Sequence, residues 1–573
     1  MILAKIFLTD QPKISYYIHE ERYNGSKRPL SFDTNNLRRK TMKTSKRRIS
    51  LLLACVMLLG VMMTGCGGKQ ESAPEAAAPQ AAAPEAAAPT GKSEETLVVA
   101  ISTEPSSVSP LANANGGLSG DASGVTAMGT LLKMNPETRL VESNMASYEM
   151  VDDTHYRFTL VDGACFSDGT PVTSEDVRYC LQCYADVGNA NTMYLDMTGF
   201  EIVDDSTFII ALKGYTTGWD YDLADGLPIY SKASIESIGL DNTLVTAPIG
   251  CAKYNVTEWK SGNYLLLERN ENYWDPDWIG YYKYIKFIFI PDAASRLLAV
   301  QSGDAHIAEG IATSDVISLQ ANPDVTAYSW DSGVCYNLYF NCNESAVCSD
   351  AKVREALCYA IDAEAINMAM NLGTGSVTQG WVGKNFPLYK EYYEGGHPGY
   401  DPEKAKALLA EAGYADGLTV NLACMAQMKD VATIIQESLR QVGVTLNVEV
   451  CEGQTMNERS RSGDYDITVW RTAQIVVSSQ TFNIIAPDKM GVAGYHTRFT
   501  ADGLADSIAK VMNSPDAAVQ AEGFDEVCHY VFDNYTILGL CDGNKHIAHT
   551  AGLGGFKLST RMGYLDLSDV CPQ

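Results

Sequence analysis

The chain has 573 residues, 46% of them hydrophobic and 9% aromatic, which is enough to bury a large core over roughly two to four domains or lobes. Its formal net charge is −27, but residues 1–65 carry +8, so the remainder carries −35. A body this acidic is repelled by nucleic acid and by anionic lipid. We therefore expect no nucleic-acid binding and no membrane attachment through charge alone.

The N-terminal region has the pattern of a targeting segment. A basic stretch, 43–48, precedes an apolar run, 49–63, which is shorter than the ~20 residues that a membrane-spanning helix needs. Two small residues follow, directly before Cys66. This order resembles the lipobox of bacterial lipoproteins, and the resemblance implies cleavage before Cys66 and a lipid anchor on it. We predict that residues 1–65 are a signal peptide with an upstream extension, with Met42 as the true start. The alternative is a buried segment with an incidental cysteine.

A tether is expected next, over residues 66–93. The stretch 71–90 places a proline at every fifth residue and otherwise consists mostly of alanine and glutamate. Such a stretch cannot bury a core, and regular prolines interrupt helices. The folded body should therefore begin near Glu94.

The first part of the body alternates strands and a helix. The apolar run 96–105 and the alternating run 154–160 predict strands. Thr173 and Asp176 resemble a capping box, and the residues after them predict one apolar helix face: Val177, Cys180, Leu181 and Tyr184. Cys180 and Cys183 form a C-x-x-C pair, which we interpret as packed thiol rather than metal ligation, because no second ligand pair follows.

The second part predicts a strand–helix–strand order. Residues 400–414 form a helix capped by Asp401 and ended by Gly413, with a buried stripe of Ala405, Leu408, Leu409 and Ala412. Residues 418–424 then alternate as a strand, and 430–450 read as helix, glycine and strand. This order favours a parallel α/β unit.

Four ordered motifs carry a resemblance to a known family. They are YRFTLVDGACFSDGTPVTSEDV (156–177), PIGCAKYNVTEWKSGNYLLLERNENYW (248–274), AKVREALCYAIDAEAI (351–366) and YDPEKAKALLAEAGY (400–414). From about Glu94 to the C-terminus, the chain resembles the family 5 extracytoplasmic solute-binding proteins, the peptide- and nickel-binding components of ABC importers.

The resemblance implies a two-lobed α/β fold of the type II periplasmic-binding-protein kind, with two hinge strands and a subdomain inserted in the first lobe. The expected segments are 94–140, 246–335 and 541–573 for lobe I, 141–245 for the inserted subdomain, and 336–540 for lobe II. It further implies that the lobes close over a small solute, most simply a peptide, and that a membrane permease of an ABC transporter recognises the closed form. We expect a monomer without a cofactor, anchored at the extracytoplasmic face of the bacterial membrane.

The ligand site is expected near Trp470. Peptide-binding members carry an aspartate three residues after this tryptophan, but Ala473 and Gln474 stand at and after that position here. A neutral residue cannot pair with a buried ammonium group. Arg471 instead suggests a carboxylate or other anion. The other candidates are Gln474, Thr103, Ser106, Tyr336, Tyr339 and Asn341. For each of these residues a purely structural role, in a core, a turn or the hinge, stays open.

Other ligands and functions also stay open. The histidines of the body are scattered, and His546 with His549 is the only close pair, so no metal site is predicted although a nickel or haem ligand is an alternative. The thirteen cysteines after Cys66 are expected to be mostly reduced buried thiols. Two further functions are alternatives: a sensing lipoprotein that acts with a membrane receptor, and an extracellular hydrolase, for which no nucleophile or zinc motif is found.

Overall fold

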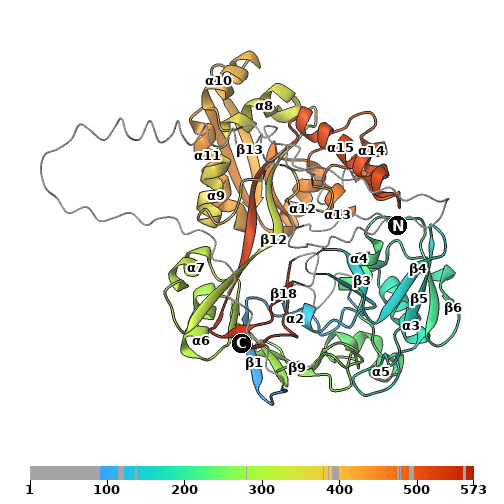
Figure 1. Cartoon of the computed structure of the whole chain (residues 1–573). Coiled ribbons are helices and arrows are strands. Elements are labelled where there is room, and N and C mark those ends of the chain that lie inside the picture. Colours follow the sequence, from blue (N-terminus) through green and yellow to red (C-terminus); the bar gives the residue numbers. More distant parts are fainter. Residues whose placement is uncertain are drawn as a thin grey trace, which may run out of the picture. The chain divides into compact units, whose positions relative to one another are not determined.

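The computed structural model describes residues 91–113, 122–135, 138–278, 280–378, 380–384, 386–389, 399–473, 477, 479–489, 496–558 and 563–573. The proposed signal peptide, Cys66 and nearly all of the proposed tether lie outside them. The largest feature is a ten-stranded sheet with the order β14-β13-β15-β12-β16-β11-β1-β10-β9-β8 (Figure 1). Helices pack against this sheet, so the mixed α/β class predicted from the sequence is confirmed.

Two long strands, β12 (Val325–Phe340) and β16 (Ile537–Thr550), lie at the centre of the sheet. They pair with each other in antiparallel fashion. At one end β16 also pairs with β11, and at the other end β12 also pairs with β15, so both strands run from one half of the sheet into the other. The register shifts between Asp331 and Val334, where the two halves meet. Such irregularities bend a strand pair. The predicted boundaries after residues 335 and 540 fall inside these two strands, and the boundaries themselves stay a prediction.

Lobe I is built on the half of the sheet that contains β1. This strand pairs in parallel with β10 and β11, and β10, β9 and β8 continue as antiparallel neighbours. The strands are β1 (Thr96–Ile101), β8 (Tyr254–Lys260), β9 (Tyr264–Arg269), β10 (Tyr284–Phe289) and β11 (Ile307–Glu309), with helices α2 (Ala122–Thr126), α6 (Ala293–Ser302) and α7 (Thr313–Leu319). The C-terminal residues add the short strands β17 (Leu553–Gly554), β18 (Lys557–Leu558), β19 (Leu565–Asp566) and β20 (Cys571–Pro572).

The inserted subdomain has its own antiparallel sheet, of order β4-β5-β7-β6, and its own core. Its strands are β3 (Val141–Ser143), β4 (Ala146–Met150), β5 (His155–Leu160), β6 (Glu201–Ile202) and β7 (Thr207–Ala211), and its helices are α3 (Ser174–Asp186), α4 (Trp219–Asp225) and α5 (Lys232–Ile238). Strand β2 (Leu132–Met134), within the segment predicted for lobe I, pairs with β3. The capping box predicted at Thr173 is present, because its side chain accepts from the Asp176 N–H and the Asp176 carboxylate accepts from the Thr173 N–H. Cys180 is fully buried on the apolar face of α3, as predicted.

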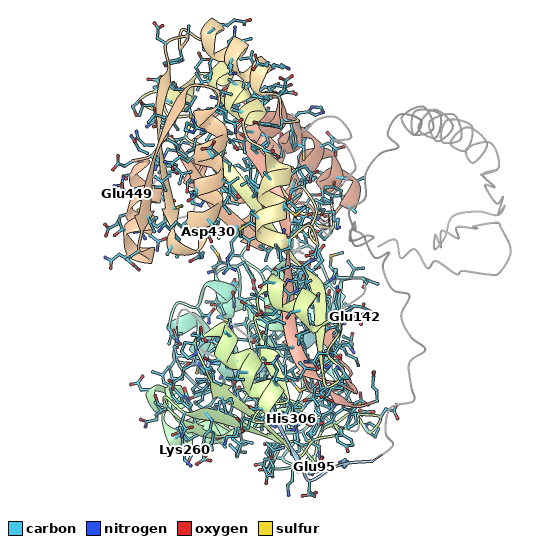
Figure 2. The ribbon with its side chains drawn as sticks, turned by 90° about the vertical axis from the view of Figure 1, so that its left-hand side faces the viewer. Glu95, Glu142, Lys260, His306, Asp430 and Glu449 are labelled. Atoms are coloured by element: carbon cyan, nitrogen blue, oxygen red, sulfur yellow. The ribbon has the colours of Figure 1, made fainter. Side chains whose placement is uncertain are left out.

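Lobe II contains the predicted strand–helix–strand unit. Strands β13 (Leu418–Met425) and β14 (Val444–Cys451) pair in parallel, with α11 (Lys429–Arg440) between them in sequence. The other elements are β15 (Ile467–Ala473), α8 (Ala351–Ala360), α9 (Ala363–Asn371), α10 (Pro402–Glu411), α12 (Gly453–Ser462), α13 (Ser479–Phe482), α14 (Leu504–Met512) and α15 (Ala517–Asp533). Asp401 caps α10 as predicted, accepting from the Lys404 N–H at 2.9 Å. In Figure 2 the labelled Asp430 and Glu449 mark this lobe, and Glu95, Lys260 and His306 mark lobe I.

A buried arginine fixes the start of α8. Arg354 is 3% exposed, and its guanidinium donates to the carbonyls of Cys348, Ser349 and Asn534, each at 2.8 Å. The contact to Asn534 ties α8 to the turn that precedes β16. Three backbone carbonyls thus take the place of the water that would otherwise solvate the guanidinium. A buried charge needs such hydrogen-bond partners.

The cysteines of the described residues are free thiols, thirteen in all, and eleven of them are buried. Burial raises the pKa of the Cys180 thiol well above its ordinary value. Such thiols pack as small apolar side chains and react slowly.

Candidate functional site

Trp470 lies on β15 against a stack of aromatic rings. Its ring centre is 5.3 Å from that of His496, which in turn is 5.2 Å from the ring of Tyr339. Burial lowers the pKa of His496 to about 3, so this imidazole is neutral at ordinary pH. Trp470 itself is only partly buried. The stack holds the indole in one orientation, as a stacking wall for a ligand requires, and it also contributes to the core.

Arg471 and Tyr336 stand opposite each other in the pairing of β15 with β12. Arg471 is exposed and Tyr336 is half-buried. The ring of Tyr336 extends across Gly543 of β16, where an added Cβ would come within 2.9 Å of it. A side chain at 543 would therefore force the Tyr336 ring to shift. This arrangement brings Arg471 and Tyr336 to the region where β12 and β16 pass between the lobes.

Lys545, which the sequence analysis did not single out, lies on β16 near this pair. Its Nζ is 3.5 Å from the centre of the Tyr564 ring and 3.5 Å from the Gly563 carbonyl oxygen. The pKa of Lys545 is lowered to about 8, mainly by burial; the charge of Glu309 opposes the change and that of Arg471 adds to it. Two cations thus act on each other at the hinge, and an anion placed there would relieve their repulsion.

Asp542 is a second hinge residue that the sequence analysis missed. It is 6% exposed, and it accepts hydrogen bonds from the hydroxyls of Ser376 at 3.1 Å and Thr378 at 2.9 Å. The pKa of Asp542 is raised to about 6, mainly by burial and with a contribution from the charge of Asp331. In the pairing of β12 with β16 it stands opposite Cys335, one position away from Tyr336, and therefore belongs to the other face of the strand pair.

Tyr339 and Asn341 are enclosed by protein. Tyr339 is fully buried and its hydroxyl accepts from the Asn337 amide at 3.1 Å. Asn341 is 1% exposed, and its amide donates to the carbonyls of Gly463 at 2.9 Å and Tyr465 at 2.7 Å. Both side chains have protein partners in this conformation, and their contact with a ligand stays a prediction.

Thr103 and Ser106 are exposed in the turn after β1. The Ser102 and Thr103 hydroxyls lie 3.3 Å apart. Between the two candidates, Glu104 accepts from the Trp259 indole and from the Gly262 N–H, both at 2.9 Å, which fixes the turn on the β8–β9 hairpin. Their role in binding stays a prediction, and Gln474 and Cys66 lie outside the described residues.

The close histidine pair has protein partners. His546 Nδ1 is 2.8 Å from the Ser329 hydroxyl, and His549 Nδ1 is 3.0 Å from the Thr550 carbonyl oxygen. Burial lowers the pKa of both imidazoles. Within the described part of the chain, no group of three or more His, Cys, Asp or Glu side chains is arranged to hold a metal ion.

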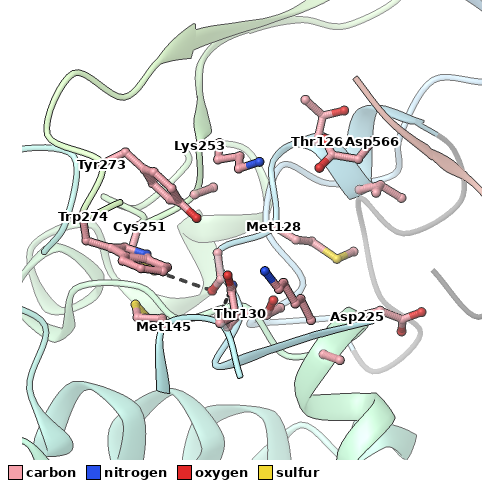
Figure 3. Close-up of a pocket in the computed structure, with 16 residues that line it drawn as sticks. Thr126, Met128, Thr130, Met145, Asp225, Cys251, Lys253, Tyr273, Trp274 and Asp566 are labelled. Carbon is pink, nitrogen blue, oxygen red and sulfur yellow. Dashed lines mark hydrogen bonds between the residues drawn. The ribbon is translucent and has the colours of Figure 1, made fainter. Parts of the chain in front are cut away.

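A separate small cavity lies where the inserted subdomain meets lobe I (Figure 3). Its volume is about 100 Å³, and Cys251, Lys253, Tyr273, Trp274 and Asp566 are among the residues that line it. Ligand pockets for small molecules commonly enclose ~300–1,000 Å³. None of the predicted binding residues lines this cavity. Ligand contact by Trp470 and Arg471 stays a prediction.

Comparison with known proteins identifies the family. A profile described as bacterial extracellular solute-binding proteins, family 5, middle part, matches residues 136–487, more than half of the chain. The chain belongs to this family. The resemblance drawn from the sequence is thereby confirmed, and the two-lobed type II fold with it. Family 5 proteins are the substrate-binding components of ABC importers and act outside the cytoplasm.

Relatives of this family 5 protein bind different ligands according to their names. The oligopeptide-binding protein AppA of Bacillus subtilis strain 168 is 24% identical over 567 residues, 90% of this chain and 97% of AppA. The heme-binding protein A of Haemophilus influenzae is 26% identical over 407 residues, 65% of this chain and 73% of that protein. The structure of DppA from Helicobacter pylori in complex with the peptide STSA matches with a TM-score of 0.67 at 19% identity, over 83% of this chain and 98% of that one.

No helix of the described residues combines the length and the apolar character needed to cross a membrane.

Proposed function

We propose that this family 5 protein binds a peptide or peptide-like solute between its lobes and delivers it to the permease of an ABC transporter without converting it. Two relatives support this substrate class: AppA is an oligopeptide-binding protein, and DppA was solved in complex with the peptide STSA. The fold supports the mechanism, because β12 and β16 cross from one lobe to the other and bend where their register shifts. A bilobed body joined by two strands can close over a solute as a rigid-body hinge motion.

The observation that carries the ligand assignment is the pair of cations at the hinge. Arg471 is exposed on β15, Lys545 lies on β16, and Arg471 is close enough to lower the pKa of Lys545. A ligand carboxylate between them forms charge-assisted hydrogen bonds, which are about twice as strong as neutral ones. The position three residues after Trp470 is Ala473, which has no charge to offer an ammonium group. The chain therefore holds the carboxylate end of its peptide at this place.

Closure follows from contacts made by both lobes at once. A ligand that touches Trp470 and Arg471 in lobe II and the turn at Thr103 in lobe I gains its full set of contacts only in the closed form. Moving an equilibrium from 1:99 to 99:1 requires about 10⁴-fold tighter binding to the closed form. Several backbone hydrogen bonds and one charge pair reach that difference.

The location follows from the N-terminal segment. A diacylated Cys66 would hold the protein at the outer face of the cytoplasmic membrane, and two acyl chains anchor stably where one does not. The tether, 66–93, would leave the body free to reach a permease.

A thermal-shift experiment with matched peptides tests the ligand assignment. The probe is a defined library of unmodified di- to pentapeptides, and the same library with amidated C-termini. We expect stabilisation by the free acids and a loss of most of it with the amides. Saturation at 100 times the dissociation constant stabilises the folded state by about 2.7 kcal/mol.

Substitution of the arginine provides the residue-level test. Arg471→Met should weaken binding of the free acids about 10- to 100-fold, the value of one or two hydrogen bonds to a charged group. Arg440→Met is the matched control, because Arg440 is exposed on α11 and pairs with Glu437 at 2.7 Å. Equal stabilisation by acids and amides would refute the carboxylate site. Stabilisation by haem or by nickel with histidine, and by no peptide, would replace the substrate class.

A further inference from the structure

A loop of the inserted subdomain reaches a helical hairpin of lobe II. Thr217 lies between β7 and α4, and its N–H donates to the Met512 carbonyl at 2.7 Å. Its hydroxyl donates to the Val511 carbonyl, also at 2.7 Å. The amide of Gln520, in the first turn of α15, donates to the Thr217 hydroxyl oxygen at 3.0 Å and to the Ser514 carbonyl at 2.7 Å. These four residues, Thr217, Val511, Met512 and Gln520, form what we call the Thr217 interlobe contact.

The chemistry of the contact suits the end of a helix. Val511 and Met512 are the last residues of α14, and the final carbonyls of a helix have no partner within it. Thr217 supplies two donors to them. Gly218, the N-cap residue of α4, follows with a φ of +82°, a conformation that favours glycine. This turn presents the N–H and the hydroxyl of Thr217 to the same helix end.

The contact is a second connection between the lobes. These hydrogen bonds join the inserted subdomain to lobe II. The covalent connections between the lobes run through β12 and β16 instead. In Figure 1, α4 is drawn on the same side of these strands as α14 and α15. A rotation about the hinge that parts the lobes therefore separates Thr217 from Met512.

We propose that Thr217 and Gln520 are positioning residues that set the equilibrium between the open and closed forms of this protein. Their hydrogen bonds exist only when the lobes approach each other, so they stabilise the closed form whatever the ligand is. The inference rests on the hinge motion of the proposed function but not on the peptide assignment. A stronger interlobe contact raises the closed fraction of the ligand-free protein. A weaker one lowers this fraction and therefore the apparent ligand affinity, although neither residue contacts the ligand.

Two substitutions and two controls test the proposal on the ligand-free protein. Thr217→Val removes the hydroxyl and keeps the shape, and Gln520→Leu removes its amide donor. Thr217→Ser keeps the hydroxyl and should behave as the unaltered protein. Thr257→Val removes an exposed hydroxyl that donates to a carbonyl within lobe I, at Leu266, and serves as the matched control.

Small-angle scattering and hydrogen exchange give the readouts. We expect Thr217→Val to raise the ratio of open to closed forms about two- to tenfold, the effect of one or two net hydrogen bonds. The radius of gyration should then increase, and the protection of the Thr217 N–H should fall by the same factor. Gln520→Leu should have little further effect in the Thr217→Val background, since the two side chains share one bond.

The outcomes separate this proposal from the ligand assignment. An unchanged radius of gyration in Thr217→Val, in a protein whose circular dichroism shows an intact fold, overturns the role in closure. The same holds if Thr217→Ser opens the protein as much as Thr217→Val. If no peptide binds but the variants open as described, the peptide assignment fails and the interlobe contact stands.

Discussion

Replacing Asp542 by asparagine should change the pH dependence of stability in a defined direction. The carboxyl group is 6% exposed on a hinge strand, and burial raises its pKa from the ordinary 3.8 to about 6. Between these two pH values the folded protein binds more protons than the unfolded chain. The contribution of Asp542 to stability is therefore highest below pH 3.8 and is lost as the pH rises through about 6.

The magnitude follows from the size of the shift. A change of about two pKa units corresponds to about 3 kcal/mol between the protonated and the ionised site. Asparagine stays neutral, and the hydroxyls of Ser376 and Thr378 can rotate to accept from its amide as well as donate to it. Asp542→Asn should thus stabilise the protein by about 1–3 kcal/mol at about pH 8 and have little effect at about pH 4.

Urea unfolding of the unaltered protein and of Asp542→Asn across this pH range gives the difference in their free energies of unfolding. The pH effects of other groups cancel in this difference. Asp152→Asn is a control of opposite sign, because the Thr154 backbone N–H and the His155 side chain lower the pKa of Asp152 to about 2. That variant should lose stability at neutral pH, and the loss should disappear as the pH falls from about 4 towards 2. If the effect of Asp542→Asn is the same at every pH, the reasoning about the hinge carboxylate is wrong.

Three further predictions concern the site, the core and the thiols. Trp470→Ala should abolish peptide-induced stabilisation in the thermal-shift assay while the protein stays folded, and an unchanged peptide response removes Trp470 from the site. Arg354→Met should lower the free energy of unfolding by about 2–4 kcal/mol, because three carbonyls lose their donor, and urea unfolding with no loss of stability would contradict this. Titration of the unfolded body should find thirteen reactive thiols in residues 91–573, and a count far below that would show disulfides.

Local features of the fold could be predicted because their determinants lie close together in the sequence. The capping box at Thr173 and the helix after it need only four neighbouring residues, and both are present as predicted. Asp401 and α10 are likewise close together in the sequence. The alternating patterns of β13 and β14 and the helical pattern of α11 also lie within one continuous segment. The family motifs extended this reading to the two-lobed fold.

The hinge site was harder to predict because it depends on pairing across about two hundred residues. Lys545 and Asp542 belong to β16, which the sheet order β15-β12-β16 brings near Arg471 of β15, and Asp542 bonds to Thr378, far away in the sequence. One signal was available: the run GLCDGNKHIAHT (539–550) places Asp542, Asn544 and Lys545 close together in the middle of a strand. Conversely, Asn341 has a polar side chain at the end of a strand, and nothing local shows that two backbone carbonyls already occupy its amide.

Native mass spectrometry of the protein purified from its own cells addresses the solute-binding function directly. We predict a population that carries one additional small mass per chain, released unchanged on unfolding and identified by fragmentation as a peptide or a peptide-like compound. A protein that never carries a solute, and that gains no mass from the defined peptide library, would contradict the binding function. So would release of a chemically altered compound.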